Sequence, residues 1–304
     1  MGGPGHDGAG MTASAGPEVI SARSPRVRAA RQLAKRAFRQ RARSFLAEGP
    51  QAVGEALASG AAVTELFVTG PALARFGELA AVAAGRGATV HAVSGDVMTE
   101  LAQTVTPQGL LAVCQFVDVP LARLLAAGPR LVVVLASVRD PGNAGTVLRT
   151  ADAAGADGVI FSGASVDPYN SKCVRASAGS LFHLPVVVDA PLAESVLALR
   201  GAGLRVLAAD GGAHRTLDEA ESAAGLGQPT AWLFGNEAWG LPGDVLALAD
   251  EAVAVPIYGR AESLNLAAAA AVCLYASARW LYAPARAHRA GSLSAQAEIS
   301  PPAG

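Results

Sequence analysis

The sequence contains few cysteines and few aromatic residues. Its three cysteines, Cys114, Cys173 and Cys273, are odd in number and far apart in a chain of 304 residues. Such spacing supports neither a disulfide framework nor a Cys-x-x-Cys metal site, and it predicts a reducing, cytoplasmic location. Aromatic residues make up only 5% of the chain, against 51% for all hydrophobic residues. This composition favours an α/β core filled by Ala, Val and Leu.

Segments that would direct the chain to a membrane are also missing. The N-terminal residues 1–20 lack the charged start and the unbroken apolar core of a signal peptide. The longest apolar run, at 266–278, is shorter than the roughly 20 residues that a membrane-spanning helix needs. We therefore expect no membrane partner. The five histidines lack metal-ligand spacing, so no metal is expected either.

The loops that usually bind nucleotide phosphates are absent as well. Residues 131–138 form an apolar run without polar alternation, which is typical of a strand buried on both faces of a parallel sheet. Neither G-x-G-x-x-G nor a P-loop follows this run, so a generic nucleotide-binding enzyme is not favoured. The stretch 209–214, which looks like a catalytic loop, is explained by a turn after a strand.

Positive charge is concentrated near the N-terminus. The net charge of the chain is −1, yet nine cations and no acid lie within residues 19–47, and the rest of the chain has a net charge of −10. This asymmetry predicts a polyanionic partner. Apolar residues recur in the segment at helical spacing, while Arg28, Arg31, Lys35 and Arg39 share another face. We predict one basic amphipathic helix that faces this polyanionic partner; the alternative is a solvated surface helix.

Strand and helix patterns divide the chain into two folded parts. Short strands and helices up to about residue 117 predict a small α/β/α domain, and the remainder alternates apolar strands with helices, as in a doubly wound parallel sheet. The last helix is predicted to begin at a Ser263 cap and to end at Pro284. The predicted divisions are 1–22 (disordered tail), 23–118 (smaller α/β/α domain with the basic helix), 119–130 (linker), 131–284 (main α/β domain) and 285–304 (disordered tail).

Three loops at strand ends hold the conspicuous polar and glycine residues of the second part. They read RDPGNAGTVLRTA from residue 139, LFGNEAWGLPG from residue 233 and VPIYGRAESLNLA from residue 255. In open α/β sheets, the loops at the carboxyl ends of the strands build the ligand site. In this order and spacing, the three loops resemble the three motifs of the SpoU (TrmH-like) branch of the SPOUT RNA methyltransferases, over about residues 131–283.

Other segments extend the resemblance. Residues 167–186 also look like this family, and residues 27–57 followed by TPQGLLAV at 106–113 resemble the accessory substrate-binding domain of members that modify ribosomal RNA. That domain has a fold akin to a small ribosomal protein. The resemblance implies a catalytic domain with a parallel sheet, helices on both faces and a trefoil knot, and it implies a homodimer that forms through the knotted domain.

The resemblance also implies roles for individual residues. Asn143 organises the first loop, and Arg149 projects from the following helix toward the ribose that receives the methyl group. Arg149 acts either as the base or as a guanidinium that binds phosphate and stabilises the alkoxide. A guanidinium keeps its proton in proteins, which favours the second role. Glu237 orients Arg149 or the ribose, and Ser263 and Asn265 position the substrate.

The implied cofactor is S-adenosylmethionine, held in a bent shape by backbone groups of glycine-rich loops. The predicted cofactor-binding residues are Gly235, Asn236, Val255, Ile257 and Leu264. Phosphate contacts are expected from two basic segments, because RNA affinity depends on neutralising the backbone. The predicted RNA-binding cations are Arg28, Arg31, Lys35 and Arg39 in the first segment and Lys172 and Arg175 in the second.

The chain departs from the family pattern at a few positions. Ala238 and Trp239 stand where glycine is common, Ile257 replaces a usual methionine, and Ala267 replaces a usual serine. These changes concern substrate identity more than cofactor binding. The aromatic side chains of Trp239 and Tyr258 either stack on a base or pack under their loops.

The sequence therefore predicts an enzyme that transfers a methyl group from S-adenosylmethionine to a ribose 2'-hydroxyl of ribosomal RNA, with 23S ribosomal RNA as the first expectation. Transfer RNA is the alternative substrate. A non-catalytic RNA-binding factor of ribosome assembly with the same fold is the alternative of another class. The presence of Asn143, Arg149, Glu237, Ser263 and Asn265 together argues against that factor, because a binding module has no need of all five.

Overall fold

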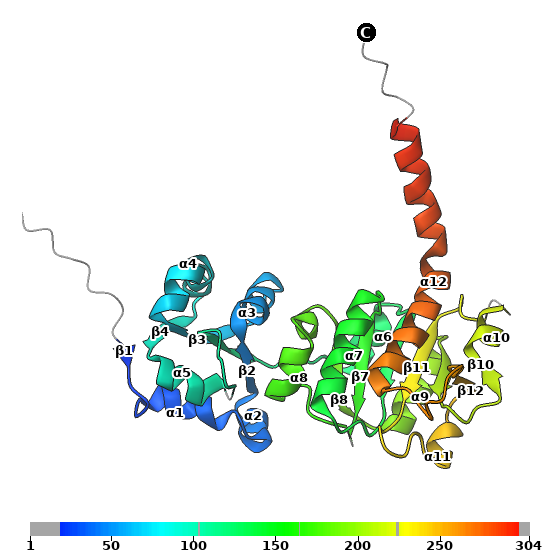
Figure 1. Ribbon diagram of the computed structural model, residues 1–304, viewed down its shortest axis with the longest axis horizontal. Coiled ribbons are helices and arrows are strands. Elements are labelled where there is room, and N and C mark those ends of the chain that lie inside the picture. The colour runs from blue at the N-terminus through cyan, green and yellow to red at the C-terminus, as the bar shows by residue number, and fades with distance from the viewer. Residues whose placement is uncertain (1–18, 103, 164, 223–224, 298–304) are drawn as a thin grey trace, which may run out of the picture.

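The computed structural model describes residues 19–102, 104–163, 165–222 and 225–297. Two units lie side by side in it, each built around its own sheet (Figure 1). Most of the predicted N-terminal tail, residues 1–18, lies outside the described residues, as do residues 298–304 of the predicted C-terminal tail.

The N-terminal unit has three layers, as predicted. Its five strands lie in the order β1-β4-β3-β5-β2, with β5 antiparallel to both neighbours and the other pairs parallel. Helices α3 and α4 pack on one face of the sheet, and α1 and α5 pack on the other. The strands are β1 (Val19–Ile20), β2 (Ser44–Glu48), β3 (Val63–Thr69), β4 (Thr89–Val93) and β5 (Leu110–Gln115). The helices are α1 (Pro25–Gln32), α2 (Arg36–Ala42), α3 (Gly49–Ala58), α4 (Gly70–Gly85) and α5 (Gly95–Ala102).

The prediction of one continuous basic helix is wrong. The segment breaks into α1 and α2, because Lys35 has an extended backbone, and α2 ends at Arg43 in the left-handed region. Residues 44–48 then form strand β2, which pairs with β5. Phe45 and Ala47 are buried in one cluster of the core while Leu46 is buried in the other, so this stretch has the two-residue period of a strand.

The C-terminal unit is built on a sheet of seven parallel strands in the order β10-β12-β9-β11-β6-β7-β8. Strands β6, β7 and β11 are buried along their whole length. Their continuous apolar sequences therefore match the parallel sheet that was predicted. The strands are β6 (Leu131–Leu135), β7 (Gly158–Ser162), β8 (Val186–Ala190), β9 (Arg205–Ala209), β10 (Arg215–Thr216), β11 (Thr230–Phe234) and β12 (Glu251–Ala254).

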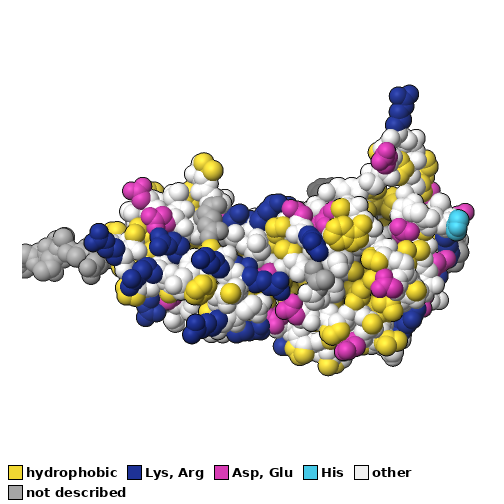
Figure 2. Space-filling model, turned by 90° about the horizontal axis from the view of Figure 1, so that it is seen from below, with side chains coloured by type: hydrophobic (Ala, Val, Ile, Leu, Met, Phe, Trp, Pro, Cys, Tyr) yellow, Lys and Arg dark blue, Asp and Glu magenta, His cyan; other side chains and the backbone are white. Residues whose placement is uncertain are grey.

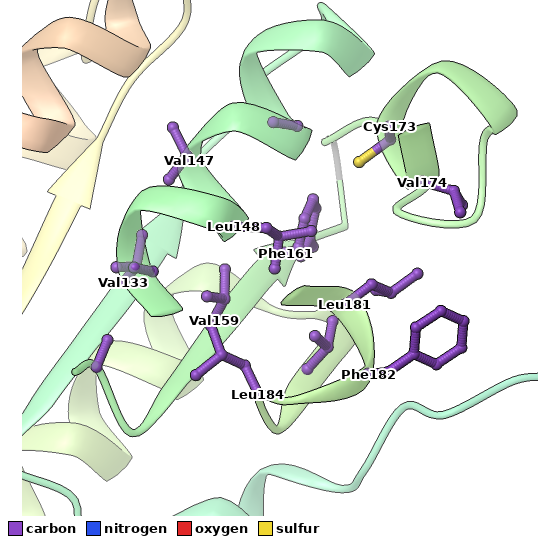
Figure 3. Packing of buried hydrophobic residues seen from close by; sticks show 14 of the residues in the cluster. Val133, Val147, Leu148, Val159, Phe161, Cys173, Val174, Leu181, Phe182 and Leu184 are labelled. Carbon is purple, nitrogen blue, oxygen red and sulfur yellow. The ribbon is translucent and has the colours of Figure 1, made fainter. Parts of the chain in front are cut away.

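Helices cover both faces of this sheet. Helices α7 and α12 lie on one face, and α6 and α9 lie on the other. They are α6 (Leu121–Ala126), α7 (Pro141–Ala153), α8 (Ser171–Ala176), η1 (Ser180–Phe182), α9 (Leu192–Gly201), α10 (Leu217–Ser222), α11 (Gly243–Leu246) and α12 (Leu266–Ala297). Figure 3 shows Val147 and Leu148 of α7 above Val133, Val159 and Phe161 of the sheet. This packing fixes α7, and with it the loop that precedes it.

The last helix differs from its prediction at both ends. It begins at Leu266, where the side chain of Asn265 accepts a hydrogen bond from Ala267 N at 2.9 Å, so Asn265 and not Ser263 is the cap. It continues past Pro284 to Ala297, through residues that were predicted as a tail. None of the helices described is long and apolar enough to span a membrane.

Candidate functional site

A pocket of about 430 Å³ opens at the carboxyl ends of β9, β11 and β12. This is the edge of a parallel sheet at which ligands usually bind, and the volume is that of a small-molecule site. Three stretches form its wall: 209–211 after β9, 234–240 after β11 and 253–269 after β12. Residues far apart in the sequence thus meet because their strands are neighbours in the sheet.

Most of the predicted site residues line this pocket. All five predicted cofactor residues do so, as do three of the five predicted catalytic residues. They are Gly235, Asn236, Val255, Ile257 and Leu264 of the first set, and Glu237, Ser263 and Asn265 of the second.

One part of the wall was missed by the sequence analysis. Ala209, Asp210 and Gly211 border the pocket, although the stretch 209–214 was interpreted as a turn without a role. A turn is present, since Ala213 N donates to Asp210 O at 3.2 Å. The signal that could have identified it was its position directly after the buried strand β9, at the same sheet edge as the other two loops.

The loop after β11 is a small rigid hairpin. Asn236 and Gly240 exchange two backbone hydrogen bonds of 2.9 Å. A Cβ atom at Gly235 would collide with the carbonyl of Gly240, so only glycine fits there. The Asn236 amide donates to Ser137 O at 2.9 Å, and its carbonyl oxygen accepts from Ala238 N at 2.9 Å. The hairpin is therefore tied both internally and to the end of β6.

Glu237 joins the second loop to the first. Its carboxylate accepts hydrogen bonds from the backbone N–H groups of Arg139 and Asp140, at 3.3 and 3.2 Å, and from the Asn143 amide at 3.2 Å. Asn265 of the third loop donates to Asn143 Oδ1 at 3.1 Å. Asn143 thus sits between Glu237 and Asn265, which border the pocket, and the three loops form one hydrogen-bonded unit.

The first loop is also anchored from behind. Asp140 caps α7 by accepting from Asn143 N at 2.8 Å, and its other oxygen receives Lys172 Nζ at 2.8 Å. The hydrogen bond from Lys172, followed by the one from Asn143 N–H, lowers the pKa of Asp140. The carboxylate therefore stays ionised and holds the start of α7 in place.

Arg149 lies elsewhere. It is exposed on α7, does not line the pocket, and forms no ion pair with any residue that the structure describes. Within one chain, the structure does not bring its side chain together with Glu237, Ser263 and Asn265. Any role in the site needs RNA or a second copy of the chain to bridge the gap.

The predicted RNA-binding cations have different surroundings. Arg28 and Lys35 are exposed and have no ion-pair partner among the described residues. Arg31 is exposed and pairs with Glu100 at 2.8 Å. Lys172 pairs with Asp140, and Arg175 pairs with Glu48 at 3.2 Å across the two units.

Arg39 is the exception that corrects the prediction. Only 3% of it is exposed. Its guanidinium donates to Asp167 of the C-terminal unit at 2.7 and 2.9 Å, and to the carbonyls of Leu33 and Ala34. The side chain lies against the other unit instead of facing solvent. These hydrogen bonds satisfy donors that burial would otherwise leave unpaired. It joins the units and is not open to an RNA phosphate.

The charge of the pocket limits its ligand. Asp210, Glu237 and Glu262 contribute carboxylates, whereas none of the described residues that line the pocket is Lys or Arg. A phosphate-bearing ligand would meet negative charge without a counter-ion, and a ligand with a positive centre would be favoured. The described residues also contain no group of three or more side chains that could hold a metal ion.

Sequence families match both units. Residues 130–275 match the SpoU rRNA Methylase family, and residues 24–112 match the MRM3-like substrate binding domain. A relative from Bacillus subtilis, named 23S rRNA (guanosine(2553)-2'-O)-methyltransferase RlmP, is 35% identical over 77% of this chain and 88% of its own length. A 23S rRNA (uridine(2479)-2'-O)-methyltransferase from Streptomyces viridochromogenes is 36% identical over 62% of this chain and 66% of its own length.

Solved structures agree with these matches. The AdoMet-bound rRNA methyltransferase from Sinorhizobium meliloti superposes with a TM-score of 0.75 at 33% identity, over 86% of this chain and 97% of that one. The SpoU methyltransferase AviRb from Streptomyces viridochromogenes, in complex with AdoMet, superposes with a TM-score of 0.73 at 31% identity, over 84% of this chain and 98% of that one.

Proposed function

Because this chain belongs to the SpoU rRNA methylase family, we propose that it transfers the methyl group of S-adenosylmethionine to a ribose 2'-hydroxyl of ribosomal RNA. The observation that carries the proposal furthest is the charge of the pocket. It has three carboxylates and no cation among its described lining residues, which suits a sulfonium and disfavours the phosphates of NAD or ATP.

The residues of the pocket fit S-adenosylmethionine. Backbone groups of Gly235, Val255 and Ile257 are available to the edges of an adenine, and the aliphatic side chain of Leu264 offers an apolar surface to its plane. The carboxylates of Asp210 and Glu262 can accept hydrogen bonds from the ribose hydroxyls and the amino group of the cofactor. When bound, the cofactor supplies an electrophilic methyl group with a neutral thioether as the leaving group.

The chain must place the acceptor oxygen in line with that methyl group and help the hydroxyl lose its proton. Glu237 and Asn143 keep the first and second loops in register, so their role is to position the loops around the acceptor ribose. Ser263, which is exposed at the pocket, and Asn265 present hydroxyl and amide groups to the substrate.

Arg149 acts on the RNA side of the reaction. Its exposed guanidinium has no acidic partner among the described residues, so it is available to a phosphate next to the acceptor ribose. There it holds that phosphate, and through it the acceptor ribose, in place by a charge-assisted hydrogen bond. Since α7 does not bring Arg149 to the pocket of its own chain, bound RNA completes the site.

The RNA and the second protomer occupy different surfaces in this proposal. Lys and Arg side chains gather over the N-terminal unit on the face seen in Figure 2, and α1, α2 and α11 all lie along that lower side in Figure 1. RNA would cross this face toward the loop before α11. A homodimer, formed through the knotted domain in the cytoplasm, would use the exposed side of α12, where Val272 and Tyr275 are 42% and 49% exposed.

Radiolabelled methyl transfer tests the proposal. Purified protein, labelled S-adenosylmethionine and total RNA from cells that lack the protein should give label in 23S ribosomal RNA, and the label should resist alkaline cleavage at the modified nucleotide. Arg149→Ala should lose the transfer while keeping cofactor affinity. Label in transfer RNA would redirect the substrate assignment, and RNA binding without any transfer would replace the enzyme with an assembly factor.

A further inference from the structure

A second tryptophan of the C-terminal unit has an unusual setting. Trp232 is fully buried in β11, and its indole N–H donates to Ser277 at 2.8 Å. Trp239, seven residues later, is 55% exposed. Its indole N–H forms no hydrogen bond with a described residue. Tryptophan is enriched at contact surfaces, because its ring is apolar while its N–H is polar.

The backbone around Trp239 is fixed. It stands at the tip of the hairpin closed by Asn236 and Gly240, between Ala238 and Gly240, both of which line the cofactor pocket. Gly240 has a φ of +67°, a conformation that suits glycine and turns the chain back after the tryptophan. The backbone that carries the ring is thus held next to the pocket, and little backbone entropy is left to lose on binding.

Arg139 completes the surface. Its guanidinium carbon lies 5.2 Å from the centroid of the Trp239 ring, and its backbone N–H donates to Glu237 at 3.3 Å. Arg139 forms no ion pair with a residue that the structure describes. It therefore places a free positive charge beside an aromatic ring, next to a pocket whose own described lining has none.

We infer that Trp239 and Arg139 form the platform on which a nucleobase of the substrate RNA stacks, with Arg139 also contacting the adjoining phosphate. This inference rests on the proposed function. The 2'-oxygen and the base are attached to adjacent carbons of the same ribose, so a base must lie close to any ribose that enters the pocket. Exposed aromatic rings and guanidinium planes are the groups on which proteins stack bases splayed out of RNA.

Steady-state kinetics on ribosomal RNA test the platform. Trp239→Ala should raise KM for RNA about tenfold, the effect of losing one base stack. KM for S-adenosylmethionine should change less than about twofold, since the predicted cofactor contacts are elsewhere in the pocket. Trp239→Phe should restore most of the loss because it keeps an aromatic face. Leu197→Ala, which removes another exposed apolar side chain on α9, is the matched control and should behave as wild type.

A modified substrate makes the test specific. Once label transfer has located the acceptor nucleotide, two RNA fragments are made, one without the base at that position and one without the base of its neighbour. The fragment that lacks the stacked base should be methylated equally by wild type and Trp239→Ala, because the stacking partner is gone. If wild type and Trp239→Ala methylate both fragments unequally, or if Trp239→Ala leaves KM for RNA unchanged, the platform is overturned while the methyltransferase stays in place. A change in oligomeric mass on light scattering would assign Trp239 to the protomer interface instead. A wild-type protein that methylates no RNA overturns the proposed function itself.

Discussion

Folding brings the residues of the cofactor pocket together, whereas it gives the cations of the basic N-terminal segment different surroundings. The pocket gathers residues from three loops separated by up to about 60 positions, and eight of the ten predicted cofactor-binding and catalytic residues line it. The basic segment is continuous in sequence, yet its cations divide: Arg28 and Lys35 face solvent, whereas Arg39 is buried against Asp167. Proximity in sequence therefore said less about shared function than strand order did.

The difference has a physical origin. Parallel strands end at one edge of their sheet, so polar residues at strand ends converge whatever their separation in the chain. Charged residues on a helix are distributed around its axis, and the partner on each side decides their role. For α2, the partner on one side is the segment of the C-terminal unit that contains Asp167.

The largest expected effect is on stability and would sharpen this division. Arg39→Ala should leave Asp167 buried without its partner and lower the free energy of unfolding by about 3 kcal/mol or more. Thermal unfolding measures it. Arg41→Ala, on the same helix but exposed and without an ion pair among the described residues, should stay within about 0.5 kcal/mol of wild type. Equal stability of both variants with equal loss of RNA affinity would return Arg39 to the RNA-binding set.

The next effect is on catalysis and concerns the pocket alone. Glu237→Gln keeps the shape of the side chain but replaces one acceptor oxygen by an amide NH2 group, which faces the N–H of either Arg139 or Asp140. The first loop should shift, and kcat/KM should fall about a hundredfold, as expected for a small misplacement of reacting groups. Thermal stability and affinity for RNA, measured in parallel, should change little. A Glu237→Gln enzyme with full activity would show that the contact is not needed to align the loops.

The sequence predicted strands buried on both faces better than it predicted a short strand within a helical pattern. The apolar strand at 131–135 was identified because burial on both faces leaves a continuous hydrophobic sequence, and the strands at 158–162 and 230–234 have the same pattern. Strand β2 was hidden inside the basic segment, because its five residues are too few to outweigh a helical pattern around them.

The site was predicted unevenly for related reasons. The loop at 209–211 was missed because its composition is that of any turn. It borders the pocket only because its strand is a neighbour of the strands that carry the other loops. The burial of Arg39, and the position of Arg149 away from the pocket, depend on how separate elements dock. No local pattern records such contacts.

A third, smaller effect tests the other side of the division. Replacing Arg28 and Lys35 by alanine should weaken RNA binding at low salt and reduce the slope of log affinity against log salt by roughly one for each cation. Fluorescence titration at several salt concentrations measures this slope. Arg123→Ala removes an exposed cation of the C-terminal unit and is the control. If it lowers the slope as much as the paired change does, the N-terminal unit has no special place in RNA binding.

The smallest expected effect lies where the two units meet. His183 Nδ1 contacts Asp152 of α7 at 2.7 Å and Nε2 contacts Glu55 of α3 at 3.0 Å. The hydrogen bonds to Asp152 and then Glu55 raise the pKa of His183. Only the protonated ring donates to both carboxylates at once, so protonation strengthens the tie between the units. The ring is 37% exposed, and solvent screening limits the contribution to less than about 1 kcal/mol.

The stability that protonation of His183 adds depends on pH. A pKa raised by folding adds stability that is complete below the unfolded value of about 6.5 and is lost as pH rises through the folded value. The melting temperature of wild type should therefore exceed that of His183→Gln by more at pH 6 than at pH 9, whereas His214→Gln, a change at an exposed histidine, should show no such trend. A difference that is the same at both pH values would mean that the ring joins the units by packing alone, and that the charged contacts between them are those of Arg36, Arg39 and Arg175.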